Sequence, residues 1–305
     1  MNGRQEKHMN NTTKQVIGFI GLGVMGEPIC RNLAVKTGAR VIAHDLDAAP
    51  LQRLAAHGVQ AAPSAAAVMQ AADVVFLSLP SGEIVAQLCR QDGGLLASAR
   101  AGQTIVDLST SPVDTTRELA REFAALGTQF VDAPVARTRA AAEAGTLAVM
   151  VGAAPEVFEA VKPLIATFAS DIALCGPVGC GQVLKILNNM VLFETVVAVS
   201  EAKAIGEKAG VDPNVLFDTL SKGSADSFAL RNHGMKAVLP GEFPERAFSV
   251  LYARKDLKYA LQLARDAGVD ARGAAVVDAW FQQAIDSGLG EKYHPVISRL
   301  IAGQR

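Results

Sequence analysis

The first half of the chain alternates between short apolar runs and segments of mixed polarity with helical spacing. Apolar runs of this kind, separated by helical segments, are typical of buried strands in a doubly wound, mostly parallel α/β sheet. The predicted strands are 16–20, 40–45, 73–79, 104–108, 129–135 and 147–151. The predicted helices among them are 28–33, 52–57, 65–71, 82–89 and 112–126.

The second half lacks convincing strand patterns and predicts helices alone. Segment 179–210 contains no Pro and is rich in strong helix formers, so it predicts one long helix, about 45 Å in length at ~1.5 Å per residue. Further helices are predicted at 213–222, 228–238, 247–268, 273–287 and 295–302. We therefore expect a disordered tail at 1–14, an α/β domain at 15–177 and an all-helical domain at 178–305, of which 178–209 is the connecting helix.

One face of the long helix is polar for only about two turns. Lys185, Asn188 and Asn189 have i, i+3 and i+4 spacing and project from the same side, which continues with the apolar Leu192 and Val196. Buried lysines are rare unless they are paired or functional. A Lys that extends to solvent at the start of the helix, beside Asn residues that cap a neighbouring segment, is the alternative at this stage.

Composition narrows the class of protein. A net charge of −1 and 19% charged residues lack the basic excess of a nucleic-acid-binding protein. Met1–Gln15 is polar and resembles neither a signal peptide nor a membrane anchor, and the most apolar stretch, Met190–Ser200, is interrupted by Glu194. The four cysteines form no metal-binding spacing, so we expect reduced thiols in a cytoplasmic protein without a metal site and without membrane association.

A glycine-rich segment directly follows the first predicted strand and opens a helical pattern. It reads Gly21-Leu22-Gly23-Val24-Met25-Gly26. In this context Gly21 permits a tight turn, Gly23 lets the backbone approach a pyrophosphate and Gly26 permits close packing of helix on strand. The free N–H groups at the start of the helix then bind the phosphates, which predicts a dinucleotide site.

Asp45 ends the second predicted strand and bears on the choice of dinucleotide. A carboxylate at this place accepts hydrogen bonds from the adenosine ribose and repels a 2′-phosphate, and no Arg follows it in the sequence. We therefore expect NAD in preference to NADP. The alternative is that Asp45 only caps the next helix. Other residues expected to face cofactor or substrate follow the carboxyl ends of strands: Leu79, Pro80, Thr110, Arg137 and Thr138.

Taken together, these segments resemble the β-hydroxyacid dehydrogenase family, which includes 3-hydroxyisobutyrate dehydrogenase and tartronate semialdehyde reductase. The resemblance covers nearly the whole chain and occurs in the same order. After the glycine-rich segment it includes Asp107-Leu108-Ser109-Thr110-Ser111-Pro112, Asp132-Ala133-Pro134-Val135, Lys185-Ile186-Leu187-Asn188-Asn189 and Lys255-Asp256-Leu257.

The resemblance implies a role for each matching residue. The glycines and Asp45 would hold the dinucleotide, and Thr110 and Lys255 would approach its nicotinamide end. Lys185 would be the catalytic acid–base residue, with a pKa lowered by burial. Asn188 would bind the substrate from the second domain, with Asn189 in support.

The sequence departs from the family after Val135. The family usually has Ser-Gly-Gly there, a loop that holds the substrate carboxylate, whereas this chain has Ala136-Arg137-Thr138. The sulfolactaldehyde reductase branch of the family carries a similar Arg-Thr pair. Arg137 and Thr138 are therefore expected to bind a strongly anionic substrate, because Arg suits bidentate contact with carboxylate or sulfonate. The alternative is an ion pair between Arg137 and a surface acid such as Glu143.

The function expected from the sequence is NAD-linked interconversion of a small, anionic β-hydroxy acid and its semialdehyde. Two alternatives stay open: a related reductase of the same architecture, such as an imine reductase, a sulfolactaldehyde reductase or a decarboxylating enzyme like 6-phosphogluconate dehydrogenase, and a non-catalytic dinucleotide-binding protein. Since long apolar helices are often buried against another subunit, we also expect a homodimer or homotetramer.

Overall fold

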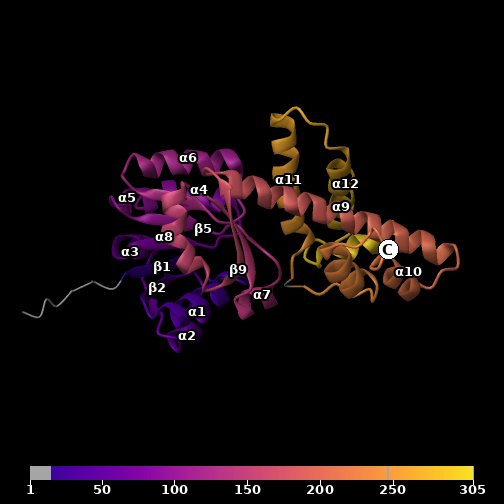
Figure 1. The fold of residues 1–305 in the computed structure, drawn as a ribbon, viewed down its shortest axis with the longest axis horizontal. Coiled ribbons are helices and arrows are strands. Elements are labelled where there is room, and N and C mark those ends of the chain that lie inside the picture. Colours follow the sequence, from indigo (N-terminus) through magenta and orange to yellow (C-terminus); the bar gives the residue numbers. More distant parts are fainter. Residues whose placement is uncertain (1–14, 246, 305) are drawn as a thin grey trace, which may run out of the picture. The chain divides into compact units, whose positions relative to one another are not determined.

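The computed structural model describes residues 15–245 and 247–304, in two compact units that divide between Gln182 and Val183 (Figure 1). The predicted disordered tail at 1–14 lies outside the described residues. The first unit contains the sheet and the second is helical (Figure 1).

The first unit is built on six parallel strands in the order β3-β2-β1-β4-β5-β6. Their bounds are β1 Val16–Ile20, β2 Arg40–His44, β3 Gln60–Ala61, β4 Val74–Leu77, β5 Thr104–Asp107 and β6 Gln129–Asp132. This order reverses between β1 and β4, which is where doubly wound sheets bind dinucleotides. The predicted fold class is thus confirmed. Strand β3 was not predicted, because it has only two residues and both are exposed.

Three more strands extend the sheet beyond β6: β7 Val135–Ala136, β8 Leu147–Gly152 and β9 Ala169–Gly176. Strand β8 is antiparallel to both β6 and β7 and parallel to β9. The predicted strand 129–135 is therefore two strands, separated by Ala133 and Pro134. Pro134 has no N–H to donate to the ladder, which favours a break there. Strand β9 escaped prediction because most of its side chains are exposed or only partly buried.

Helices cover both faces of the sheet. One face packs on α1 Gly26–Thr37, α2 Ala48–Ala55, α7 Arg139–Ala144 and α8 Pro155–Ile165, and the other on α3 Ala65–Ala71, α4 Gly82–Arg90, α5 Leu95–Ser98 and α6 Val113–Ala124. On the first face Phe76 stacks on Phe19 and meets the edge of Phe168, each at a centroid distance of 6.1 Å. Burying one such ring contributes about 2–3 kcal/mol. Helix α2 begins earlier than predicted because Asp47 caps it by accepting the Ala49 N–H.

In the second unit the described residues form helices, as predicted. They are α9 Cys180–Lys208, α10 Pro213–Leu220, the π-helix η1 Leu230–Val238, α11 Val250–Asp266, α12 Arg272–Asp286, the 3₁₀ turn η2 His294–Val296 and α13 Ile297–Ile301. Phe193 of α9 is fully buried between Phe248 and Phe281, at centroid distances of 5.7 and 5.4 Å. Helices α9, α11 and α12 thus share one aromatic and aliphatic core.

The long helix α9 begins in the first unit and continues into the second. The domain boundary predicted from the sequence lies before this helix, at 177/178, whereas the compact units divide after Gln182. The physical reason is that the first turn of α9 binds the end of β6: Asp132 accepts hydrogen bonds from the N–H groups of Gly179 and Gln182.

Helix α9 is also the one helix among the described residues that is long and apolar enough to be considered as a membrane span. Only its length and composition meet the criteria for a membrane span, and a helix buried in the core of a globular protein meets the same criteria. Phe193, Val196 and Val197 of α9 are buried against the other helices of the second unit. Packing within this unit therefore explains the apolar residues on this face of α9.

Candidate active site

The glycine-rich turn has the geometry that a dinucleotide site requires. Gly21 has φ +92°, and a Cβ there would overlap the carbonyl oxygen of Ser78. A Cβ at Gly26 would overlap the carbonyl oxygen of Gly21, just after β1, and would lie 3.2 Å from the Cβ of Ser78, just after β4, so Gly26 lets α1 begin close against the ends of these strands. A Cβ at Gly23 would meet no atom within 4 Å, so its backbone is open to a ligand.

The start of α1 is available to an anion. Its N-cap residue, Met25, makes no side-chain capping hydrogen bond, and Gly23 and Val24 are exposed. The first N–H groups of a helix carry partial positive charge and need acceptors. The residues present therefore fit the pyrophosphate of a dinucleotide.

Asp45 lies beside this turn, at the end of β2. Its carboxylate accepts hydrogen bonds from the N–H groups of Leu22 and, at 2.8 Å, Asp47. Each carboxylate oxygen keeps a further lone pair for a ribose hydroxyl. The capping role that the sequence left open for Asp45 belongs to Asp47. The guanidinium of Arg53, in the following helix, is bound to Glu27 at 2.6 and 2.8 Å.

The loops after β4 and β5 are joined at the same edge of the sheet. The N–H of Leu79 donates to the Ser109 hydroxyl at 2.9 Å. The Asp107 carboxylate in turn accepts from the Ser109 N–H at 2.9 Å and from the Ser111 hydroxyl at 3.2 Å. Leu79 and Thr110, both predicted to contact the cofactor, therefore flank one hydrogen-bonded junction.

Arg137 has an unusual backbone conformation, and its guanidinium is bonded to other residues of the first unit. Its φ is +87°, the conformation that glycine adopts most readily, and it stands where the family usually has glycine. Its guanidinium donates to the Thr146 carbonyl at 2.6 Å, to the Ser170 hydroxyl at 2.9 Å and to Asp171 at 2.7 Å. The structure thus contains the alternative that the sequence left open, an ion pair with a surface acid, although the acid is Asp171 rather than Glu143.

Position along the strands explains this environment. Asp107 and Asp132 are in register at the carboxyl edge of the parallel sheet, whereas Arg137 follows β7, which continues past that edge and pairs with β8. Its side chain therefore reaches the start of β9. Hydrogen bonds from Ser170 and Arg137 lower the pKa of Asp171. Thr138 is the N-cap residue of α7, and its hydroxyl makes no capping bond.

In the second unit the structure joins Lys185 to Asn189. The Lys185 ammonium donates to the Asn189 side-chain oxygen at 3.2 Å, and the Asn189 amide nitrogen donates to Asp256 at 2.7 Å. Lys185, Asn189 and Asp256 are all buried. Asn188, which the sequence analysis favoured for substrate binding, is exposed and donates to the Asn189 oxygen at 3.2 Å. The amide beside the amine is thus that of Asn189.

The charges around Lys185 oppose one another. Burial lowers its pKa, the nearby Asp256 carboxylate raises it, and the Lys255 ammonium lowers it. A lysine with a lowered pKa can exchange a proton near neutral pH. Lys185 is thus a buried amine with a lowered pKa, beside one amide oxygen and within the influence of one carboxylate.

Asp256 is a site residue that the sequence analysis missed. Its neighbour Lys255 was predicted to contact the cofactor, and the two side chains form an ion pair at 3.2 Å. The Lys255 ammonium also lies over the rings of Tyr252 and Tyr259, at 5.1 and 5.6 Å. The available signal was the Lys-Asp-Leu segment itself, with an acid next to the lysine.

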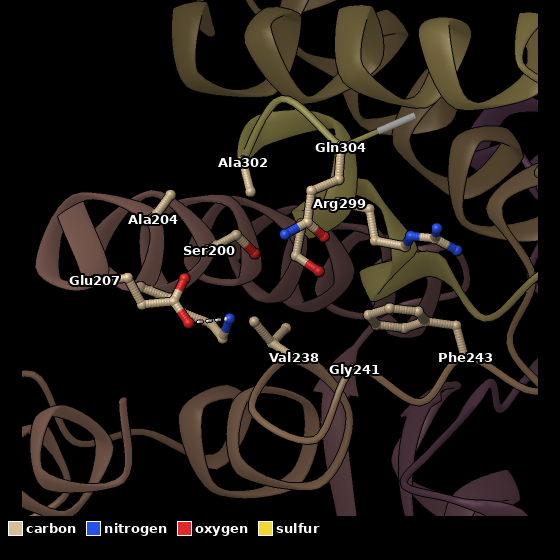
Figure 2. Close-up of a pocket in the computed structure, with 11 residues that line it drawn as sticks. Ser200, Ala204, Glu207, Val238, Gly241, Phe243, Arg299, Ala302 and Gln304 are labelled. Carbon is tan, nitrogen blue, oxygen red and sulfur yellow. Dashed lines mark hydrogen bonds and ion pairs between the residues drawn. The ribbon is translucent and has the colours of Figure 1, made fainter. Parts of the chain in front are cut away.

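One cavity of the second unit contains none of these residues (Figure 2). It has a volume of about 110 Å³ and lies between the C-terminal half of α9 and the end of the chain. On the α9 side of the cavity, Glu207 (labelled in Figure 2) pairs with the ammonium of Lys203, one turn earlier on the same helix, at 2.8 Å. An open, mostly apolar groove of about 770 Å³ in the first unit, beside Arg117 and Arg121 of α6, likewise lacks the predicted site residues.

Comparisons with known proteins agree with the geometry of both units. Residues 16–176 match the family described as the NAD binding domain of 6-phosphogluconate dehydrogenase, and residues 179–301 match the family described as NAD-binding of NADP-dependent 3-hydroxyisobutyrate dehydrogenase. The chain is 36% identical to 2-(hydroxymethyl)glutarate dehydrogenase of Eubacterium barkeri, over 90% of this chain and 91% of that protein. It is 37% identical to 3-hydroxyisobutyrate dehydrogenase of Pseudomonas aeruginosa, over 80% and 84% of the respective chains.

A solved structure is similar over almost its whole length. Mycobacterium tuberculosis 3-hydroxyisobutyrate dehydrogenase with L-serine has a TM-score of 0.85 and 30% identity, covering 94% of this chain and 99% of that one. The fold and the dinucleotide-binding turn define the class as an oxidoreductase that uses a nicotinamide dinucleotide. Within that class, the chain belongs to the β-hydroxyacid dehydrogenase family, whose members interconvert hydroxy acids and their semialdehydes.

Proposed function

We propose that this protein is an NAD-preferring dehydrogenase of a small β-hydroxy acid, with Lys185 as the acid–base residue. One observation carries the proposal: a buried amine with unused hydrogen-bonding capacity. An ammonium has three donors, and that of Lys185 makes a single hydrogen bond within the described part of the chain. Buried polar groups are normally satisfied, so the remaining capacity is free for a substrate oxygen.

The residues around Lys185 support its role in proton transfer. Asp256 holds the amide nitrogen of Asn189, which turns the amide oxygen toward the Lys185 ammonium and fixes it there. In oxidation Lys185 would take the proton of the substrate hydroxyl, and in reduction it would return that proton to the forming alkoxide. A bound nicotinamide would accept or donate the hydride.

The choice of NAD over NADP rests on Asp45 and its surroundings. A carboxylate at this position repels a 2′-phosphate and accepts from ribose hydroxyls. Arg53, a cation of the next helix, is paired with Glu27, and Arg40 of β2 donates to Gln60. Wild type should therefore have a higher kcat/KM with NAD than with NADP, and Asp45→Ala should reduce that preference. Equal or better use of NADP by the wild type would contradict the proposal.

The environment of Arg137 supports a substrate with a single carboxylate. Its guanidinium has partners in Thr146, Ser170 and Asp171, so contact with a second anionic group would require these bonds to break. A sulfonate or dicarboxylate substrate, which the sequence favoured, is the second candidate. Its support is that the related 2-(hydroxymethyl)glutarate dehydrogenase is named for a dicarboxylic acid.

A substrate panel tests both candidates. NADH formation would be followed at alkaline pH with 3-hydroxyisobutyrate, 3-hydroxypropionate, glycerate, threonate, 2-(hydroxymethyl)glutarate and a 3-sulfonate analogue. The highest kcat/KM is expected with a monocarboxylate. Highest activity with the sulfonate would instead assign the guanidinium to the substrate. Tight NAD binding without oxidation of any member would favour a non-catalytic dinucleotide-binding protein.

We also propose that the protein is a homo-oligomer. Leu184, Val191 and Ile205 of α9 are 45%, 57% and 68% exposed. Together with Ala198 they follow a seven-residue repeat, the spacing at which one helix packs along another. Light scattering on the purified protein should give a mass that is a multiple of 31.9 kDa, and introducing Glu at Val191 should reduce it. A monomeric wild type would contradict this proposal.

A further inference from the structure

The first turn of α9 is held by a carboxylate that is distant in sequence. Asp132 is fully buried at the end of β6, and its two oxygens accept the N–H groups of Gly179 and Gln182, at 2.7 and 2.8 Å. These N–H groups would otherwise lack partners, and a negative charge at this end of a helix is stabilising. Asp132 thus performs the capping role for a helix that begins far along the chain.

The helix start is packed too closely against the strands to shift. A Cβ at Gly181 would overlap the Met150 carbonyl oxygen of β8, and a Cβ at Gly152 would overlap the Asp132 carboxylate. Both glycines are therefore required for this close approach, rather than for an unusual backbone conformation. The first turn of α9 has a single position against the ends of β6 and β8.

Gln182 extends this anchor to the loop after β5. Its side chain is fully buried; the amide nitrogen donates to the Ser109 carbonyl at 2.8 Å, and the amide oxygen accepts the Ser111 N–H at 3.1 Å. The two bonds bracket Thr110, the residue predicted to approach the nicotinamide. From the other side Asp107 holds the Ser109 N–H and the Ser111 hydroxyl.

We propose that Gln182 is a positioning residue for hydride transfer. It ties the loop that presents Thr110 to the first turn of the helix that carries Lys185 three residues later. This inference rests on the proposed function, and it adds a residue that touches neither substrate nor cofactor. Small misplacements of reacting groups reduce rates by about a hundredfold. We therefore expect the buried Gln182 amide, which joins the loop around Thr110 to the first turn of α9, to have a large effect on the rate of hydride transfer.

The test compares Gln182→Met with a matched control, Gln103→Met. Gln103 is equally buried, at the opposite end of β5, and bonds to backbone groups of Arg100, Met69 and Ala72 at 2.6–2.7 Å. Both substitutions remove buried hydrogen bonds and keep the volume, so both should lower the thermal midpoint. Only Gln182→Met should slow the chemical step.

The informative measurement is the single-turnover rate of NADH formation at saturating NAD and hydroxy acid. Partial unfolding lowers the amplitude of this reaction, whereas misalignment lowers its rate constant. We expect the rate constant to fall about 10- to 100-fold in Gln182→Met, with the Kd for NADH changed less than threefold, and to be unchanged in Gln103→Met. Gln182→Asn, which keeps an amide but is one methylene shorter, should show the same slow step and supplies a second folded variant.

Three results would overturn the inference. The first is a wild-type rate constant in Gln182→Met and Gln182→Asn. The second is an equal slowing in Gln103→Met. The third is a loss of rate fully explained by weaker NADH binding. Failure of the proposed function is distinguishable, because the wild type itself would then form no NADH from any hydroxy acid.

Discussion

Each unit buries a polar cluster, and the two clusters differ in how completely their hydrogen bonds are made. In the first unit every carboxyl oxygen of Asp107 and Asp132, and both ends of the Gln182 amide, have a partner. In the second unit the Lys185 ammonium makes a single hydrogen bond among the described residues, and the Asp256 Oδ1 atom is paired with the Lys255 ammonium at 3.2 Å. A satisfied cluster supports structure, whereas an unsatisfied one has capacity for a ligand.

An unsatisfied buried group is not sufficient by itself to define a site. Both ring nitrogens of His294 lack a partner among the described residues, yet the ring is enclosed by Phe193, Phe248 and Tyr293, at centroid distances of 5.1, 5.4 and 5.1 Å. The other polar ring beside it, His233 at 5.3 Å, is itself buried and is bonded through Nδ1 to the Tyr293 hydroxyl. Lys185 differs because an amide and a carboxylate lie beside it.

The largest expected effect concerns the amine itself. Lys185→Met should lower kcat by about 10²- to 10⁴-fold, the usual contribution of a general acid or base, while the Kd for NADH stays near the wild-type value. The control is Lys203→Met on the same helix, where the ammonium is already paired with Glu207. Wild-type turnover in Lys185→Met would remove this residue from the mechanism.

The next effect is the opposite response of buried groups in the two units to acid. Burial lowers the pKa of His233 to about 4 and that of His294 well below its usual value. In the unfolded chain these rings take up a proton near pH ~6.5. The free energy of unfolding of the second unit should therefore fall as the pH drops from about 6.5 toward 4. The loss is about 1.4 kcal/mol for each unit by which the folded-state pKa lies below the unfolded-state pKa.

The carboxyl groups of the first unit act with the other sign. Burial raises the pKa values of Asp107 and Asp132 to about 6, so the cost of burying their charge decreases as the pH falls from 6 toward 4. Hydrogen exchange at pH 7 and pH 5 should therefore show loss of protection mainly in residues after Val183. His294→Phe should reduce this loss of protection in the second unit. An equal loss of protection in both units would contradict the expected difference between them.

A smaller effect distinguishes the influence of Asp256 from that of Lys255 on the pKa of Lys185. Asp256→Asn removes the charge that raises the pKa of Lys185, so the rising limb of kcat/KM with pH, measured in the direction of oxidation, should move to lower pH. Lys255→Gln removes the charge that lowers this pKa, so the limb should move to higher pH. Shifts in the same direction would show that Lys185 does not control this limb.

The smallest effect concerns the ion pair between Arg137 and Asp171. The left-handed conformation costs a non-glycine residue about 1–2 kcal/mol, and the ion pair with Asp171 is exposed to solvent, which weakens it. Arg137→Gly should therefore unfold in urea with a free energy about 1 kcal/mol higher than Arg137→Ala, which loses the ion pair and keeps the strain. Both variants should keep the wild-type KM for a monocarboxylate. A large rise in KM in both would assign the guanidinium to the substrate.

The sequence by itself determined the features that depend on local patterning. Apolar runs predicted the strands, Gly21, Gly23 and Gly26 predicted the dinucleotide turn, and Asp45 followed from its place at a strand end. The helix that carries Lys185 was equally visible, because its propensity and spacing are properties of neighbouring residues. The resemblance to a known family rested on the same short segments.

Only the tertiary structure decided which distant groups meet. The partner of Arg137 is Asp171 rather than Glu143, the amide beside Lys185 belongs to Asn189 rather than Asn188, and Asp256 completes that cluster. Gln182 gave no signal in the sequence, because its partners lie more than 70 positions earlier, at Ser109 and Ser111. Contacts of this kind are set by the packing of helix on strand, which no local periodicity contains.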